Sequence, residues 1–168
     1  MKRGITFILL GLLCLILQNT IFMNFSILGV KVDLLLVYIV SISMFLDKME
    51  LIFVVIPIGI LKDAFFPYVF GINTLTYLIV SYFVNLIEGK IYKDTIIIPV
   101  LFIGLATIIK FLIFICFMYP TGMLSFSFGN IIILFVKELV LNVLMILFVY
   151  NRIRRIVTSE KLKKDWKF

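Results

Sequence analysis

Apolar residues run through this chain in long stretches that short polar segments interrupt, and this pattern predicts six helices. A helix that crosses a bilayer needs about 20 mostly apolar residues, and most stretches approach that length, although the second is short for a span. The sequence therefore predicts an all-α integral membrane protein, a six-helix transmembrane bundle that forms one domain over 1–150. We expect helices at about 4–24, 30–46, 51–66, 71–88, 96–118 and 128–150, and a basic tail at 151–168.

The composition excludes most soluble and catalytic classes of protein. The 168 residues are 64% hydrophobic and contain no histidine, which removes the usual proton shuttle and the commonest metal ligand. Cys14 and Cys116 both lie in apolar stretches, and two cysteines alone cannot form a zinc site. The sequence has no nucleophile–base pair and no phosphate-binding loop, so we expect no enzymatic activity, no metal and no cofactor.

Basic residues are unevenly distributed between the two sides of the predicted bundle. The side that holds the termini has twelve: Lys2, Arg3, Lys48, Lys90, Lys93 and seven in the tail. The other side has Lys31 and Lys62, and Lys110 and Lys137 lie inside helices. Because cytoplasmic loops carry an excess of Lys and Arg, we expect both termini in the cytoplasm. The net charge of +7 then reflects orientation and anionic membrane lipids, and no nucleic acid partner is expected.

The segment from Pro57 to Asn73 is the most unusual part of the chain for a membrane protein. It holds two prolines, the glycines Gly59 and Gly71, and the adjacent charges Lys62 and Asp63. Within a membrane, prolines, glycines and charges of this kind are tolerated where other parts of the protein or a polar cavity surround them. Asp33 and Asp63 are expected at neighbouring helix ends, where they could share Lys62 or Lys31 or accept a hydrogen bond from a partner. The other interpretation is that both are structural charges at the membrane surface. Asp63, four residues after Gly59 and on the same helix face, is also expected to accept hydrogen bonds from Asn73 at the start of the fourth helix.

Polar residues inside the helices form two further groups. A stripe recurs on one face of the fourth helix, either for hydrogen bonding between helices or to line a cavity: Thr74, Tyr77, Ser81, Asn85 and Glu88. The second group is Lys110, Lys137, Glu138 and Asn142. A pair between Lys110 and Glu138 across two helices is reasonable, as an internal ion pair that fixes helix register or as part of a substrate path.

Three motifs, in order, resemble the rod shape-determining protein MreD family. They are the acid that opens DLLLVYIVS at Asp33, the G-x-x-x-D motif at Gly59 and Asp63, and the Gly71 loop in FGINTLTY. Length and the expected topology agree with the family, and the specific part of the resemblance covers about 33–77. One departure is Val32, where the family often has proline before the acid.

The resemblance implies a non-enzymatic subunit of the bacterial cell-elongation machinery in the plasma membrane, needed for rod shape and lateral peptidoglycan synthesis. It implies binding to MreC, a single-span protein with a large outer domain. It also implies work with MreB filaments and with the RodA glycosyltransferase and its transpeptidase partner. The matching residues Asp33, Gly59, Asp63 and Gly71 would then hold the outer-side surface that receives MreC. The sequence leaves a homodimer open.

The main alternative is a substrate-binding S component of an energy-coupling factor vitamin transporter, which is similar in size and topology. That family typically carries an A-x-x-x-A motif on its first helix, whereas this first helix reads ITFILLGLLCLILQ and has no alanine. A lipid-binding or scaffolding membrane protein of another family is a third interpretation.

Overall fold

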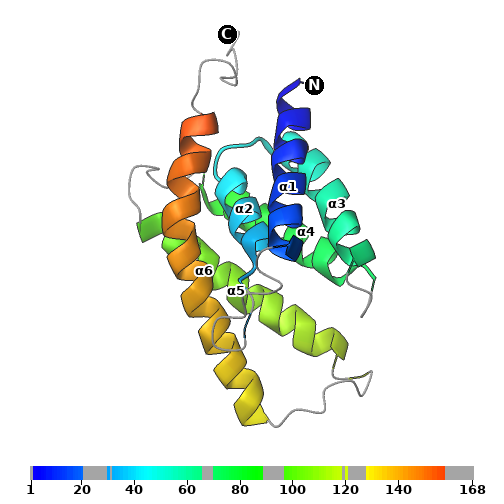
Figure 1. The fold of residues 1–168 in the computed structure, drawn as a ribbon, viewed down its shortest axis with the longest axis vertical. Helices are drawn as coiled ribbons and strands as arrows, with labels where there is room; N and C mark the ends of the chain where they lie inside the picture. The colour runs from blue at the N-terminus through cyan, green and yellow to red at the C-terminus, as the bar shows by residue number, and fades with distance from the viewer. Residues whose placement is uncertain are drawn as a thin grey trace.

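The computed structural model describes residues 2–20, 30, 32–65, 70–88, 97–118, 120 and 128–157. Those residues form six α-helices, and Figure 1 shows how these helices are arranged. The all-α architecture expected from the sequence is therefore confirmed. The helices are α1 (Lys2–Thr20), α2 (Leu34–Ser43), α3 (Lys48–Phe65), α4 (Ile72–Glu88), α5 (Ile97–Met118) and α6 (Phe128–Val157).

Three of these helices are long and apolar enough to cross a membrane. By length and composition they are α1, α5 and α6. Of the others, α2 and α4 are apolar but shorter, and α3 carries charged residues at both of its ends. Six crossings thus stay a prediction, and so do the side on which the termini lie and the similarity to S components.

The bounds of α2 and α6 differ most from those expected, and α3 begins at Lys48, three residues before its expected start. The second helix has only 10 residues, because Asp33 caps its start and the amides of Phe45 and Leu46 close its end on the carbonyl of Ile42. The sixth helix continues past Tyr150 to Val157. Its extra turns stay helical because Ile153 and Val157 continue the buried face. The Lys31 linker, the turn with Lys90 and Lys93, and the tail from 158 onward lie outside the described residues.

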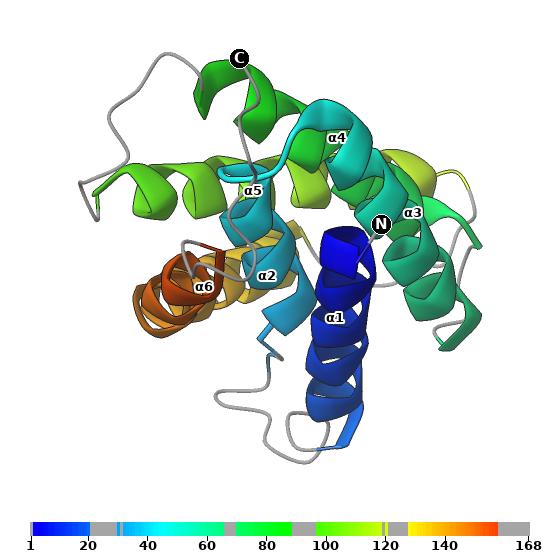
Figure 2. The same ribbon diagram turned by 90° about the horizontal axis from the view of Figure 1, so that it is seen from above.

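The short helix α2 is the centre of the bundle. All of its residues are buried, and it packs against each of the other five helices. Figure 2, which looks down on the bundle, shows α2 enclosed between α1, α5 and α6. A helix that is apolar all round belongs in the interior, so the sequence of α2 fits its place.

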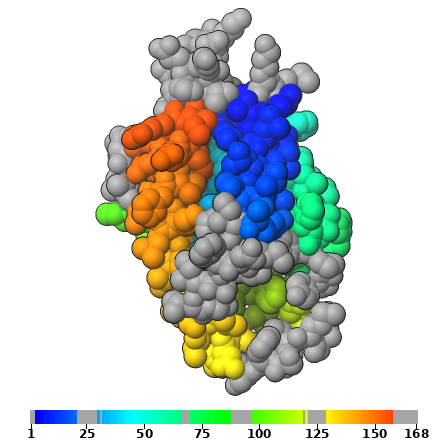
Figure 3. Space-filling view, viewed as in Figure 1, coloured from blue at the N-terminus to red at the C-terminus, as the bar shows by residue number. Residues whose placement is uncertain are grey.

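Large apolar side chains cover the outside of the bundle. On α1 an exposed stripe with helical spacing consists of Ile5, Leu9, Leu13 and Ile16. On α6 a similar stripe includes Val140, Leu144 and Phe148, and Figure 3 shows α1 and α6 forming much of one face. Exposed apolar patches this large are unusual on soluble monomers, whereas lipid receives them without cost.

Candidate functional site

Asp33 lies at the centre of the most connected polar group in the described structure. It is the residue before α2 and only 2% of its surface is exposed. One carboxylate oxygen accepts a hydrogen bond from the amide of Leu36 at 3.2 Å, which caps the helix. Its own backbone amide donates to the side-chain oxygen of Asn142 on α6 at 3.1 Å. The start of α2 is therefore tied both to its own first turn and to α6.

Two lysines from different helices bind this one carboxylate. The ammonium of Lys62 on α3 lies 2.8 Å from Oδ1, and that of Lys110 on α5 lies 2.6 Å from Oδ2. The hydroxyl of Tyr77 on α4 donates to Oδ1 at 3.2 Å and accepts a hydrogen bond from Lys62. Both oxygens of Asp33 thus have charged partners, as a buried carboxylate requires.

The network continues to the remaining helices. Lys110 also pairs with Glu138 on α6, and the amide of Asn142 donates to the hydroxyl of Thr107 at 3.2 Å. From α1, Gln18 accepts from the amide of Leu35 at 3.0 Å and its amide group lies 3.4 Å from Asp33. We call this group the Asp33 cluster: Gln18, Asp33, Lys62, Tyr77, Thr107, Lys110, Glu138 and Asn142.

The composition of the Asp33 cluster explains how charges persist in an apolar bundle. An isolated charge at the middle of a membrane costs about 3 kcal/mol on insertion scales. Here two acids, Asp33 and Glu138, are matched by two lysines, Lys62 and Lys110. The cluster lies near the ends of α1 and α3 but midway along α5 and α6. It therefore fixes how the helices are staggered.

A second polar group joins α3 to the start of α4. Asp63 is 1% exposed and accepts four hydrogen bonds, from the amides and side chains of Asn73 and Thr74, at 2.5–3.0 Å. The positive end of a helix dipole favours a carboxylate at this place. Gly71 precedes α4 with φ of 97°, a conformation that glycine adopts readily. We call Gly59, Asp63, Gly71, Asn73 and Thr74 the α3–α4 corner.

Gly59 makes the α3–α4 corner tight. A Cβ atom at this position would lie 2.7 Å from the Cα of Thr74 and 2.9 Å from its hydroxyl oxygen. The backbones of α3 and α4 could not approach this closely with any larger residue, which is how small residues act in membrane helix pairs. The contact expected between Asp63 and the start of the fourth helix is therefore present, and Gly59 permits it.

The polar stripe expected on the fourth helix is divided among several contacts. Thr74 binds Asp63, and Tyr77 joins the Asp33 cluster. The side-chain amide of Asn85 donates to the carbonyls of Ser43 and Leu46 beside the end of α2, whereas Ser81 donates to Leu78 within its own helix. Hydrogen bonding between helices thus accounts for most of the stripe. The side chain of Glu88 lies outside the described structure.

The structure also assigns partners that the sequence left open and adds new members. Lys62 pairs with Asp33 rather than with Asp63, and Lys110 pairs with Glu138. Gln18 and Thr107 were not among the expected site residues. A weak signal existed for Thr107, since it precedes Lys110 by three residues and shares its helix face. Among the described residues, no three acids, cysteines or histidines lie close enough to hold a metal ion.

Comparison with known proteins gives one match. A sequence model of the family described as rod shape-determining protein MreD matches residues 1–156. Neither the curated proteins nor the solved structures provide a significant match. The matched region includes the whole Asp33 cluster and the α3–α4 corner. It covers all but the last 12 of the 168 residues, so the chain belongs to the MreD family of rod shape-determining proteins.

Proposed function

We propose that the protein is a non-enzymatic membrane subunit of the bacterial cell-elongation machinery that binds an MreC-like single-span protein. In this role it is needed for rod shape and for lateral peptidoglycan synthesis. MreB filaments and the RodA glycosyltransferase with its transpeptidase partner are further partners, reached directly or through the MreC-like protein. The observation that carries the proposal is the family match over residues 1–156.

The α3–α4 corner is the surface that we propose for the MreC-like partner. It is fixed in shape by the hydrogen bonds of Asp63 and the close approach at Gly59. Large apolar side chains surround it, since Phe65, Phe70 and Leu75 are 62%, 69% and 40% exposed. Aromatic residues at the centre of an interface commonly carry much of the binding energy. A rigid corner with exposed aromatic residues suits a membrane partner.

Asp63 has an indirect role in this proposal. Its carboxylate is buried and already accepts four hydrogen bonds, so it shapes the corner rather than touching the partner. Phe65 and Phe70 are exposed and would make the contact. The two kinds of residue can therefore be separated by experiment.

The test measures how much MreC-like partner co-purifies with variants of the chain. Asp63→Ala removes a helix-terminal carboxylate worth about 2 kcal/mol when buried, and we expect about a tenfold loss of partner together with lower thermal stability. Asp63→Asn should fall between Asp63→Ala and wild type. Asp47→Ala, at the other end of α3, is the control and should bind normally. Every variant must first insert and accumulate as wild type does.

Substitutions of the exposed aromatic residues distinguish direct contact with the partner from an effect on the shape of the α3–α4 corner. Phe65→Ala with Phe70→Ala should lower partner recovery without lowering thermal stability. Phe53→Ala is the matched control, because Phe53 is 71% exposed on α3 away from the corner. Full recovery of the partner by Asp63→Ala and by the double variant would show that the corner is not the binding surface.

Depletion in a rod-shaped host tests the function itself. Cells should become round as the protein disappears, and wild-type protein expressed from a plasmid should restore rods. Rod-shaped cells that instead lose uptake of one vitamin would favour the transporter alternative.

A further inference from the structure

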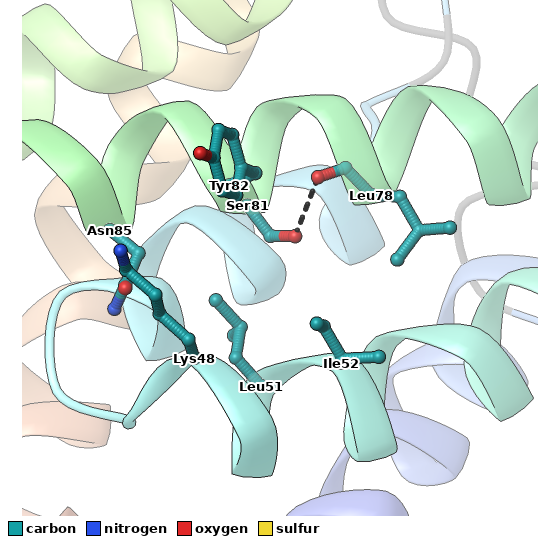
Figure 4. A pocket seen from close by; sticks show the side chains of 7 residues that line it. All are labelled: Lys48, Leu51, Ile52, Leu78, Ser81, Tyr82 and Asn85. Atoms are coloured by element: carbon teal, nitrogen blue, oxygen red, sulfur yellow. Dashed lines mark hydrogen bonds between the residues drawn. The ribbon is translucent and has the colours of Figure 1, made fainter.

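A crevice lies between α3 and α4, at the end of these helices opposite the α3–α4 corner. They touch at Gly59 and Thr74, whereas near Lys48 and Asn85 a cavity of about 200 Å³ opens. Figure 4 shows Lys48 and Asn85 at one end of it, and Ile52 and Leu78 at the other. The lining residues are Lys48, Leu51, Ile52, Leu78, Ser81, Tyr82 and Asn85.

The walls of the crevice offer an apolar surface. The hydroxyl of Ser81 donates to the carbonyl of Leu78 at 3.0 Å. Both side-chain donors of Asn85 are directed to the backbone of Ser43 and Leu46. With these donors engaged inside the protein, Leu51, Ile52 and Leu78 provide the contact surface. Such a lining suits a hydrocarbon chain better than a polar ligand.

A lysine lies at the mouth of the crevice. Lys48 is the first residue of α3 and is exposed, with its ammonium 5.9 Å from the ring centre of Tyr82. Tyr82 is 54% exposed, and tyrosine and lysine at a helix end are typical of the headgroup level of a membrane. The carboxylate of Glu50, two residues after Lys48, forms an ion pair with Arg3 at 3.7 Å.

We propose that this crevice binds one acyl chain of an anionic phospholipid, with the lipid phosphate against Lys48. Asn85 lies seven positions after Leu78 on α4, so the crevice extends about 10 Å along this helix. That length is enough for the upper part of an acyl chain. Ile52 is 43% exposed and its neighbour Phe53 is 71% exposed, so the apolar wall continues onto the outer surface of the bundle. A lipid can therefore enter sideways from the bilayer. This site is independent of the partner surface at the other end of α3.

Lipid titration of the purified full-length protein, followed by native mass spectrometry, tests the site. We expect phosphatidylglycerol to remain bound at lower concentrations than phosphatidylcholine. Lys48→Ala should weaken phosphatidylglycerol binding about fivefold, the usual effect of one lysine near anionic lipid, and Lys48→Arg should retain it. Arg152→Ala is the charge control, because Arg152 is an exposed basic residue on α6.

A second pair of variants tests the apolar part of the crevice without changing charge. Ile52→Trp fills the cavity and should weaken binding at least fivefold. Ile60→Trp is the matched control, since Ile60 lies on the same helix with the same 43% exposure but does not line the crevice. Equal losses from Lys48→Ala and Arg152→Ala, or unchanged binding by Ile52→Trp, would overturn the proposal and indicate a diffuse lipid shell. Normal monodispersity of all variants shows that each one is folded.

Discussion

At the scale of single residues, the main finding is that one carboxylate coordinates the bundle. Asp33 caps α2 and binds Lys62 and Lys110 from two other helices. Replacing one member of a buried ion pair destabilises a protein much more than replacing both members with apolar residues, because the remaining charge is left without a partner. Asp33 is therefore the residue at which the smallest change should have the largest effect on stability.

We predict that Asp33→Asn destabilises the protein by about 3–5 kcal/mol, the usual cost of breaking a buried pair. Lys62 would then lose its ion pair with Asp33, and Lys110 would keep its pair with Glu138. For a chain of this length the temperature of half-unfolding should fall by roughly 10 °C, measured in detergent as the loss of the monodisperse peak in size-exclusion chromatography. Asp47→Asn should change it little, because Asp47 is exposed directly before α3 and asparagine is as favourable as aspartate at a helix start.

A double variant shows whether the loss comes from the pairing. Lys62→Met removes the charge that Asp33→Asn leaves without a partner. The double variant should therefore lose less stability than the sum of the losses of the two single variants. Additive losses would mean that Asp33 and Lys62 act separately and that the ion pair contributes nothing.

At the scale of elements, the absence of a side chain at Gly59 sets the distance between α3 and α4. The hydrogen of Gly59 faces the backbone of Thr74, and a methyl group there would lie 2.7 Å from the Cα atom. Backbone cannot rotate away as a flexible side chain can. Any larger residue must therefore push the helices apart and stretch the hydrogen bonds from Thr74 to Asp63.

We predict that Gly59→Ala lowers stability by about 1–3 kcal/mol, as overpacking does. Gly104→Ala on α5 is the control, because no atom lies within 4 Å of the added methyl group. It should be neutral or stabilise by up to about 1 kcal/mol through helix propensity. The same chromatographic melting assay gives both values, and a loss from Gly104→Ala equal to that from Gly59→Ala would refute the steric argument.

At the scale of the whole molecule, the chain is a bundle with an apolar outside and a charged interior. Three helices are long enough to span a membrane by themselves, and the shorter α2 is enclosed by the others. The charge distribution in the sequence, with twelve basic residues on one side and two on the other, favours both termini in the cytoplasm. This topology places residue 121 on the opposite side from the C-terminus.

Reporter fusions test the topology. Alkaline phosphatase, which is active only outside the cytoplasm, should be active when fused at residue 121 and inactive at the C-terminus. A fluorescent protein that folds only in the cytoplasm should give the opposite pattern. If both sites report the same side, the six-crossing topology is wrong.

The sequence predicted short-range features better than long-range ones. Asp63 and Asn73 are 10 residues apart, so helix spacing and one turn were enough to place them together. The bond between Asp33 and Lys110 joins residues 77 apart, and it depends on how α5 packs against α2. No local pattern contains that information. The length of α2 was also overestimated, because an apolar run does not show where a capping side chain begins the helix.

The central place of α2 has a consequence for biogenesis. As the ribosome synthesises the chain, α2 emerges well before α5 and α6, yet Asp33 binds Asn142, which lies 109 residues later. At about 1.5 Å per residue, its 10 residues extend only about half the thickness of the hydrocarbon core. An insertion machine that releases helices one at a time into lipid would leave this segment without its partners. The polar contacts that tie α2 to α5 and α6 can therefore form only after α6 has been synthesised.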